Sequence, residues 1–311
     1  MTKWDADDIP DLSNKVAIVT GANSGLGFEA TKALAAKNCS VIMACRSIDR
    51  ATTAREAIID ENPSATLEII ELDLSSKNSI ETFVDQFKAS HDRLDILLNN
   101  AGLMAIPKRE TETGFEMQFG VNHIGHFILT GLLLDHLIAT EDSRVTTVSS
   151  IYHERTTKIR YEYLKNPDPY KKWKSYATSK LANVLFAFEL NRRLEDAGHS
   201  TISNAAHPGY ADTNLQAKGP EMEGSRFSKF IMKIGNFLFA QSAAKGVLPE
   251  LYAATSPDAQ GGKYYGPQGL MNSRGYPGEQ EATDYAKDEK MAKELWDYSE
   301  KETGIIYNFQ N

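Results

Sequence analysis

The sequence of 311 residues has little cysteine. Its two cysteines, Cys39 and Cys45, lie at the two ends of a segment that we expect to be a strand. Six strand residues span about 20 Å, whereas a disulfide needs Cα atoms within about 7 Å of each other. The sequence therefore predicts two buried structural thiols and excludes a disulfide scaffold.

Positive charge is also scarce. Lys and Arg number 34 against 42 Asp and Glu, a formal net charge of −8. A nucleic-acid-binding protein needs a basic surface to neutralise phosphates, so this balance argues against nucleic-acid binding. With 41% hydrophobic and 24% charged residues, the composition is that of an ordinary globular chain, and it argues against disorder as the main state.

Long apolar runs are missing as well. The first 14 residues form a polar, acidic arm without the basic start and apolar run of a signal peptide. No window approaches the 18 uninterrupted apolar residues that indicate a membrane-spanning helix. We expect a cytoplasmic protein without stable membrane insertion.

Short apolar segments alternate with amphipathic helical segments along the chain. Predicted strands cover residues 15–20, 40–45, 66–72, 94–98, 144–148, 201–206 and 262–265, and predicted helices cover 25–37, 50–60, 76–90, 113–139, 176–194 and 242–255. Continuously apolar strands are typical of a sheet with helices on both faces. The alternation predicts an α/β fold of the Rossmann type, a doubly wound parallel sheet of about seven strands.

No linker rich in Pro, Gly or Ser divides the chain, so we predict a single domain. Residues 1–14 are the polar arm, 15–283 the Rossmann-type domain and 284–311 a C-terminal tail of unassigned role.

A glycine-rich turn, TGANSGLG over residues 20–27, follows the first predicted strand and opens a helix. Its glycines permit a tight turn, close approach of the backbone to a pyrophosphate, and close helix–strand packing. The helix N-terminus offers N–H groups to phosphates. A plain strand-to-helix turn is the alternative interpretation. The cofactor-binding residues that we predict here are Gly21, Asn23, Ser24, Gly25, Leu26 and Gly27.

The TGxxxGxG spacing resembles the cofactor turn of the short-chain dehydrogenase/reductase family. Further motifs of that family follow in order over residues 14–270: Asp73-Leu74, the NNAG sequence at Asn99–Gly102, Asn122, Ser149-Ser150, Tyr176 and Lys180 of YxxxK, and Pro208-Gly209 with Thr213. Several segments look closest to the retinol-dehydrogenase-like and protochlorophyllide-reductase-like branches. The resemblance implies cofactor contacts from Asp73, Leu74, Asn100, Ala101, Gly102, Tyr176, Lys180, Pro208, Gly209 and Thr213.

The residues after the second strand indicate which nucleotide binds. An acid there would bind the 2′-hydroxyl of NAD, and an arginine would accept the 2′-phosphate of NADP. Here the strand is followed by Arg46, whose planar fork suits a phosphate, and by Ser47, whose hydroxyl adds a donor. We predict NADP(H); an ordinary surface arginine is the alternative.

Tyr176 and Lys180 are four residues apart and share one helix face. A nearby ammonium group lowers the pKa of a tyrosine, which brings this phenol closer to neutral pH. The resemblance implies that Tyr176 is the acid/base and that Lys180 also binds the nicotinamide ribose. It further implies that Ser150, favoured over Ser149, orients the substrate oxygen, and that Asn122 holds a water in a proton relay.

Two segments depart from the alternation. Residues 152–175 form a polar, basic and aromatic insertion that we place at the rim of the active site. Residues 213–241 carry an apolar stripe that we interpret as a substrate lid; a core-facing helix or a membrane-surface segment are the alternatives. His123 and His126 lie three apart without further ligands, so helix packing is favoured and no metal site is expected.

The resemblance therefore implies an NADP(H)-dependent oxidoreductase that interconverts an alcohol and its carbonyl. The substrate would be an apolar small molecule such as a retinoid, a steroid or an aldehyde. The alternatives are a reductase of a conjugated C=C bond on the same scaffold, or a nucleotide-sensing binding protein without catalysis. The sequence leaves open whether the protein is a homodimer or a monomer.

Overall fold

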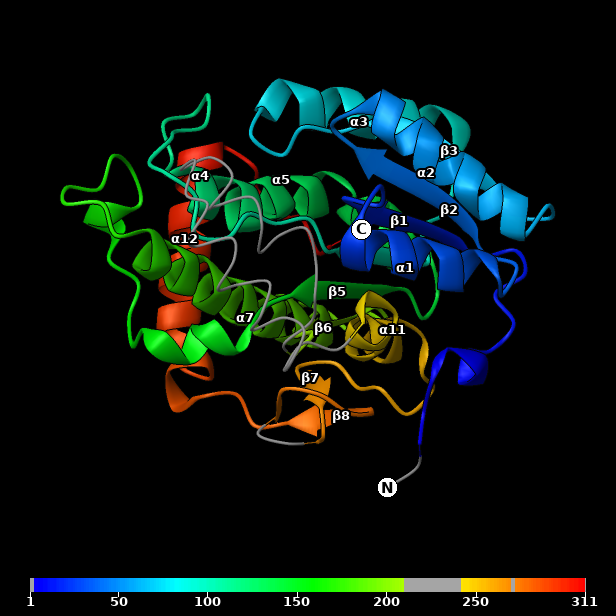
Figure 1. Ribbon diagram of the computed structural model, residues 1–311. Helices are drawn as coiled ribbons and strands as arrows, with labels where there is room; N and C mark the ends of the chain where they lie inside the picture. Colours follow the sequence, from blue (N-terminus) through cyan, green and yellow to red (C-terminus); the bar gives the residue numbers. More distant parts are fainter. Residues whose placement is uncertain (1–2, 210–241, 270–271, 311) are drawn as a thin grey trace, which may run out of the picture.

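The computed structural model describes residues 3–209, 242–269 and 272–310. Its centre is one eight-stranded sheet in the order β3-β2-β1-β4-β5-β6-β7-β8 (Figure 1). The strands are β1 (Val16–Thr20), β2 (Ser40–Cys45), β3 (Leu67–Glu71), β4 (Ile96–Asn99), β5 (Arg144–Val148), β6 (Ile202–Ala206), β7 (Tyr264–Pro267) and β8 (Pro277–Gln280). The strand order reverses at β1, which places a crevice for ligands at the carboxyl ends of β1 and β4.

The predicted Rossmann-type fold is confirmed, with one correction to the sheet. The first seven strands pair in parallel, but β8 adds to β7 as an antiparallel edge strand. The sequence PGEQ of β8 is short and polar and contains a proline, which strands tolerate only at edges. It has no apolar run, so sequence periodicity could not find it.

Helices cover both faces of the sheet (Figure 1). They are α1 (Gly25–Ala35), α2 (Ile48–Glu61), α3 (Lys77–Ser90), α4 (Met117–Phe119), α5 (Gly125–Leu132), α6 (Leu134–Ala139), α7 (Lys172–Asp196), α10 (Ala243–Gly246), α11 (Leu248–Thr255) and α12 (Glu289–Thr303). Because side chains alternate along a strand, Ile18 of β1 packs in the core beneath α3, α5 and α7, whereas Val19 packs in the core beneath α1, α2 and α11. Strand β1 thus contributes to two apolar cores, one on each face of the sheet.

The predicted long helix over residues 113–139 is wrong in detail. The structure has the short α4, a π-helical turn η2 (Gly120–Ile124), then α5 and α6. Asn122 lies in the π-helical turn. Such turns add a residue to a helix and are common at functional sites, and apolar periodicity does not reveal them. Helix α7 also begins earlier than predicted, at Lys172, four residues before Tyr176.

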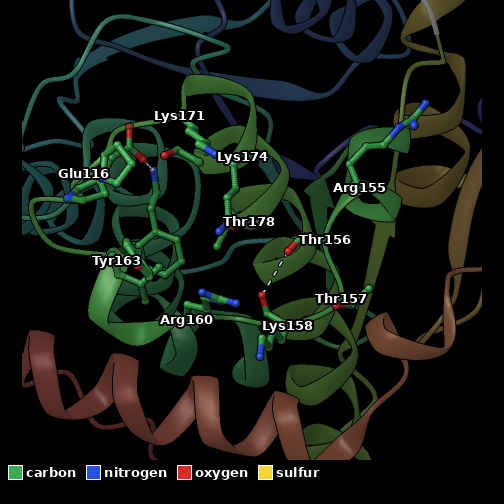
Figure 2. A pocket seen from close by; sticks show the side chains of 15 residues that line it. Glu116, Arg155, Thr156, Thr157, Lys158, Arg160, Tyr163, Lys171, Lys174 and Thr178 are labelled. Atoms are coloured by element: carbon green, nitrogen blue, oxygen red, sulfur yellow. Dashed lines mark hydrogen bonds between the residues drawn. The ribbon is translucent and has the colours of Figure 1, made fainter.

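The predicted insertion lies between β5 and α7. It contains two short 3-10 turns, η3 (Ile151–Arg155) and η4 (Tyr161–Tyr163). With the start of α7, these turns line a cavity of about 430 Å³ (Figure 2).

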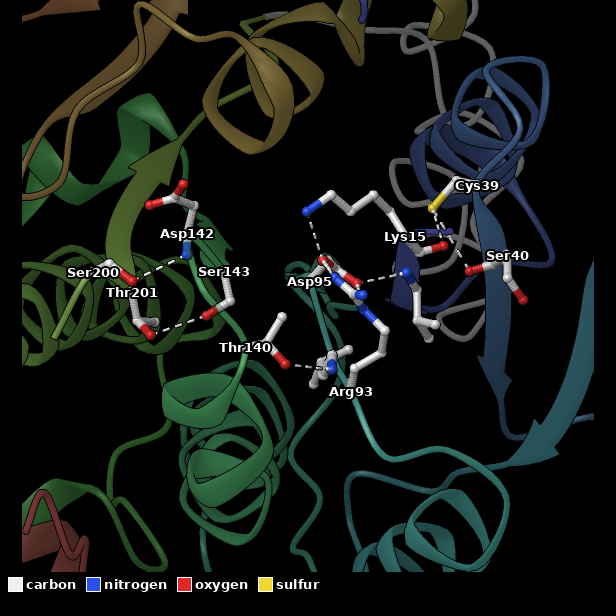
Figure 3. Close-up of polar contacts among 12 residues, drawn as sticks. Lys15, Cys39, Ser40, Arg93, Asp95, Thr140, Asp142, Ser143, Ser200 and Thr201 are labelled. Carbon is white, nitrogen blue, oxygen red and sulfur yellow. Dashed lines mark hydrogen bonds and ion pairs between the residues drawn. The ribbon is translucent and has the colours of Figure 1, made fainter. Parts of the chain in front are cut away.

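Polar contacts close the amino-terminal edge of the sheet (Figure 3). Asp95, just before β4, is 4% exposed and accepts hydrogen bonds from the Val16 backbone N–H at 2.8 Å and from Arg93 at 2.6 and 2.9 Å. Burial opposes ionisation, but these contacts and the ammonium of Lys15 hold the pKa of Asp95 below its usual value. Both cysteines are buried and free, as predicted.

The C-terminal helix α12 packs along α7, on the side away from the sheet (Figure 1). Trp296 of α12 is 2% exposed. Its ring centroid lies 5.3 Å from that of Phe127 and 5.8 Å from that of Phe186, and the Arg193 guanidinium lies 4.4 Å from its ring. The segment predicted as a tail thus joins the core beneath α5 and α7.

We predict that Trp296→Ala lowers the free energy of unfolding by about 3–5 kcal/mol, because it removes a buried indole from this core. Trp173→Ala is the matched control, since Trp173 is 44% exposed; we expect it to cost less than about 1 kcal/mol. Denaturant unfolding of both variants measures the difference. If the two variants have the same free energy of unfolding, α12 does not unfold cooperatively with the rest of the domain.

Candidate active site

The glycine turn is anchored to the neighbouring strand by Thr20. Its hydroxyl accepts hydrogen bonds from the backbone N–H groups of Asn100 and Ala101, both at 2.9 Å. The Asn100 side-chain amide donates to the Thr20 carbonyl at 2.6 Å. The Asn100 side chain, predicted to bind the cofactor, is therefore used to hold the turn in place.

His126 joins this anchor to the reaction centre. Its Nε2 lies 3.0 Å from the Thr20 hydroxyl and its Nδ1 lies 3.1 Å from the Asn122 carbonyl. Complete burial lowers the pKa of His126 to about 4, so the ring is neutral. Sequence reasoning assigned His126 to helix packing; its contact with the glycine turn is a positioning role that spacing alone could not reveal.

The geometry of the turn fits a dinucleotide. Gly21 has a φ of +69°, a region that favours glycine. A Cβ at Gly27 would lie 2.5 Å from the Gly21 carbonyl oxygen, so no larger residue fits. Ser24 is the N-cap of α1 but makes no side-chain capping bond. The first N–H groups of α1 are thus available to a pyrophosphate, as Ser24, Gly25 and Leu26 were predicted to provide.

The adenosine side of the predicted site is formed by the residues after β2 and β3. Arg46 is 65% exposed, and its Nη1 lies 4.0 Å from Asp73 Oδ2. Ser47 is the N-cap of α2 without a side-chain capping bond. The Leu74 side chain is buried, and a Cβ at Gly125 of α5 would collide with it. Leu74 therefore packs on α5 with both its carbonyl oxygen and its side chain.

The structure brings Tyr176, Ser150 and Lys180 together at the carboxyl end of β5. Tyr176 is 4% exposed, and the Ser150 side chain lies close enough to its hydroxyl to oppose a rise of its pKa. The Lys180 Nζ lies 5.8 Å from the centre of the Tyr176 ring and donates to the Val148 carbonyl at 2.9 Å. Ser149 points elsewhere, donating to the Lys180 carbonyl at 2.7 Å. Of the two serines, Ser150 is the one that reaches the tyrosine.

The predicted lowering of the Tyr176 pKa by Lys180 is not found. Burial raises the pKa of Tyr176 to about 12, and the neighbouring Ser150 hydroxyl opposes this only in part. Burial also lowers the pKa of Lys180 to about 8, against the attraction of Glu250. Desolvation therefore outweighs the effect of Ser150 at Tyr176 and the attraction of Glu250 at Lys180, and the phenol is held in its protonated form.

Asn122 lies beside these residues, but its side chain is fully engaged. Its Oδ1 accepts from the Leu103 N–H at 2.7 Å, and its Nδ2 donates to the Leu103 carbonyl and to Ser179 Oγ, both at 2.9 Å. A Cβ at Gly102 would lie 3.3 Å from Asn122 Oδ1 and 3.7 Å from Lys180 Nζ, so the three residues converge. The predicted water relay at Asn122 stays a prediction.

An aromatic wall surrounds Tyr176. The Tyr152 ring lies 5.6 Å from the Tyr176 ring and stacks on Trp173 at 5.0 Å. Tyr264 stacks on His207 at 5.1 Å, and burial lowers the pKa of His207 to about 4. His207 is thus a neutral wall residue.

The remaining predicted cofactor residues follow β6. Gly209, with a φ of +66°, donates its N–H to His207 Nδ1 at 3.1 Å, which fixes the turn after Pro208. Thr213 and the predicted lid, residues 213–241, lie outside the described residues.

Sequence reasoning missed Glu250 on α11. It is fully buried, and neither carboxyl oxygen has a hydrogen-bond partner within the described part of the chain. Burial raises the pKa of Glu250 to about 8, although the positive charge of Lys180 opposes the shift. The sequence does show an acidic residue inside the apolar segment LPELYAAT, which could have indicated a buried carboxyl group. That Glu250 lies near Lys180 depends on the tertiary fold.

Two classes of feature are absent from the residues that the structure describes. None of their helices is long and apolar enough to cross a membrane. Among the described residues, no group of three or more His, Cys, Asp or Glu side chains could hold a metal ion.

We predict that Glu250→Gln flattens the pH dependence of stability. Between the ordinary pKa of 4.5 and about 8, the folded protein holds a proton on Glu250 that the unfolded chain releases. The free energy of unfolding therefore falls as pH rises through this range. In the variant, this fall should be smaller by at least about 1.4 kcal/mol.

Denaturant unfolding at a series of pH values measures this effect. The matched control is Glu56→Gln, which replaces an exposed carboxylate on α2 and should keep the parental pH profile. If the Glu250 variant also keeps that profile, Glu250 does not carry a raised pKa.

Comparison with known proteins agrees with the geometry. A family model described as short chain dehydrogenase matches residues 15–224. Retinol dehydrogenase 14 of Mus musculus is 38% identical over 307 residues, which cover 95% of this chain and 87% of that protein. The short-chain dehydrogenase TIC 32 B, chloroplastic, of Brassica napus is 35% identical over 300 residues, covering 94% and 89%.

A solved structure of an uncharacterized protein from Mycobacterium paratuberculosis is also similar. It has a TM-score of 0.81 and 36% identity, and the match covers 99% of this chain and 100% of that one. The resemblance carried by the glycine turn, the NNAG sequence and YxxxK is thereby confirmed. The chain belongs to the short-chain dehydrogenase family and is related to the retinol dehydrogenases.

Proposed function

We propose that this protein is an NADP(H)-dependent oxidoreductase that interconverts an alcohol and its carbonyl on an apolar small molecule. The observation that carries the proposal is that the Ser150 side chain lies beside the hydroxyl of the buried Tyr176, with Lys180 one helical turn further along α7. Family membership supplies the dependence on NAD(P)(H) as a class.

The proposed reaction uses few protein groups. The bound cofactor supplies or accepts the hydride. Ser150 and Tyr176 hold the reacting oxygen through hydrogen bonds, and Tyr176 donates its proton to that oxygen when the carbonyl is reduced. The raised pKa of Tyr176 favours the protonated phenol that this step requires. Lys180, with its pKa near 8, supplies positive charge beside the phenol at neutral pH.

The character of the substrate is proposed from the wall around Tyr176. The rings of Tyr152 and Trp173 suit an apolar molecule of the retinoid, steroid or aldehyde kind. Relatives named retinol dehydrogenases support the same class. A conjugated C=C reductase remains the second enzymatic candidate, because it would use the same scaffold.

The preference for NADP(H) is proposed from Arg46 and Ser47. The Arg46 guanidinium is mostly exposed, and its ion pair with Asp73 is long, at 4.0 Å, so a 2′-phosphate could compete for it. Asp73 is the nearest acid and follows β3, whereas an NAD-binding acid would follow β2. The second hypothesis is that Arg46 is an ordinary surface residue.

We predict that Arg46→Asp shifts nucleotide preference from NADPH toward NADH by about tenfold or more, because it exchanges a phosphate-binding cation for an acid. Titration with each nucleotide, followed by nicotinamide fluorescence, measures both affinities. The control is Lys290→Asp, which makes the same change of charge on the exposed face of α12 and should leave both nucleotide affinities unchanged. Tighter binding of NADH by the parent protein would overturn the NADP(H) proposal while leaving the family intact.

We predict that Tyr176→Phe lowers turnover of a carbonyl panel by about 10²–10⁴-fold while NADPH binding is retained. The panel holds retinoids, steroids, quinones and aliphatic aldehydes, and products are identified chemically. The control is Tyr152→Phe, which removes the hydroxyl of the neighbouring ring; its turnover should stay within a few-fold of that of the parent protein. Full activity in Tyr176→Phe would remove Tyr176 as the acid/base, and a saturated product that keeps its carbonyl would favour the C=C reductase.

A further inference from the structure

The insertion between β5 and α7 lines an open cavity of about 430 Å³ that the proposed reaction does not use (Figure 2). Its wall is formed by η3, η4 and the first turns of α7. Five cationic residues line it: Arg155, Lys158, Arg160, Lys171 and Lys174. The whole chain carries a net charge of −8, so this concentration of positive charge is a local feature.

The positive charges of the cavity are not neutralised from within. No ion pair links any of the five cations to an acid among the described residues. Glu116 is the one acidic residue in the wall, and it is buried. Its carboxylate oxygens accept from the backbone N–H groups of Gln118 and Phe119, both at 3.0 Å. Glu116 therefore caps α4 and does not compensate the cations.

Two of the cations are held against an aromatic ring. The Lys174 Nζ lies 5.3 Å and the Arg160 guanidinium 5.9 Å from the centre of the Tyr163 ring. Both charges thus lie near one side chain, and their positive potentials add at this part of the wall. Figure 2 shows Arg160 and Tyr163 on the same side of the cavity, opposite Thr156 and Thr157.

The start of α7 adds to the positive potential. This helix has 25 residues, its N-cap Lys171 makes no side-chain capping bond, and its first turn contains no acid. Cations at a helix N-terminus lie at the unfavourable end of the helix dipole. The basic residues therefore do not stabilise the helix, and their positive charge favours a bound anion.

We propose that this cavity binds a small phosphate-bearing molecule. The guanidinium and ammonium groups would hold its phosphate oxygens, and the hydroxyl of Thr178 supplies a further donor. Tyr163, Leu164 and Phe119 offer an apolar surface to the rest of the molecule. The phosphate belongs either to a free metabolite or to a lipid headgroup.

This site is distinct from the proposed cofactor site. The predicted cofactor residues follow β1 to β4 and β6, whereas the cavity is built from the insertion and α7. It lies next to the reaction centre in the chain: Ser150 is the N-cap of η3, which ends at Arg155, and Lys174 precedes Tyr176 by two residues. The inference does not depend on the proposed oxidoreductase activity.

Pyrophosphate is the first probe, titrated by calorimetry into the full-length protein saturated with NADP⁺, so that the cofactor site is occupied. We expect saturable binding that weakens with added salt. Arg160→Gln combined with Lys174→Gln should weaken it by at least about tenfold, because two charged donors are lost. The control combines Lys290→Gln with Lys293→Gln, which removes the same charge from α12 and should leave pyrophosphate binding unchanged.

Vesicles distinguish the two sources of phosphate. Sedimentation with phosphatidic acid vesicles, absent with pure phosphatidylcholine and lost in the Arg160/Lys174 variant, would identify a lipid headgroup. Pyrophosphate binding without sedimentation would identify a free phosphorylated metabolite. Absence of saturable binding to either probe, or equal binding by the two double variants, would overturn the proposal. Calorimetric titration of NADP⁺ alone reports the cofactor site separately, so failure of one proposal does not affect the other.

Discussion

The arrangement of the whole site depends on one buried hydroxyl. Thr20 ends β1, and its oxygen receives the N–H groups of Asn100 and Ala101 at the end of β4. These strands flank the point where strand order reverses, and only there do two neighbouring loops diverge to leave a crevice. Through His126 the same hydroxyl is linked to Asn122. The turn that would hold phosphates and the helix beside the reacting groups are therefore parts of one rigid frame.

Burial, more than pairing, decides the charge states around the reaction centre. Tyr176, Lys180 and Glu250 are all removed from water, and each pKa moves toward the neutral form of its side chain. Lys180 keeps one hydrogen bond, to the Val148 carbonyl, and Glu250 keeps none among the described residues. A charge in such a place costs free energy unless another charge balances it. The centre is thus sensitive to any charged group that enters it.

The charge distribution outside the centre is uneven. An acidic chain places five cations around one cavity of the insertion, while the opposite edge of the sheet is closed by the fully paired Asp95. Paired charges such as Asp95 stabilise the frame, whereas unpaired charges of one sign attract a ligand. The insertion therefore adds a binding surface to a scaffold whose core it leaves unchanged.

The sequence by itself determined the alternation of strands and helices, the glycine turn and the order of the family motifs, because each depends on residues close together in the chain. It also determined that Tyr176 and Lys180 share a helix face, since that follows from helical periodicity. Only the tertiary structure decided the edge strand β8, the π-helical turn at Asn122 and the docking of α12 through Trp296. It alone also decided that Glu250 lies near Lys180 and that desolvation raises the pKa of Tyr176. These features depend on contacts between distant segments and on burial, and neither has a period or a spacing that a single sequence displays.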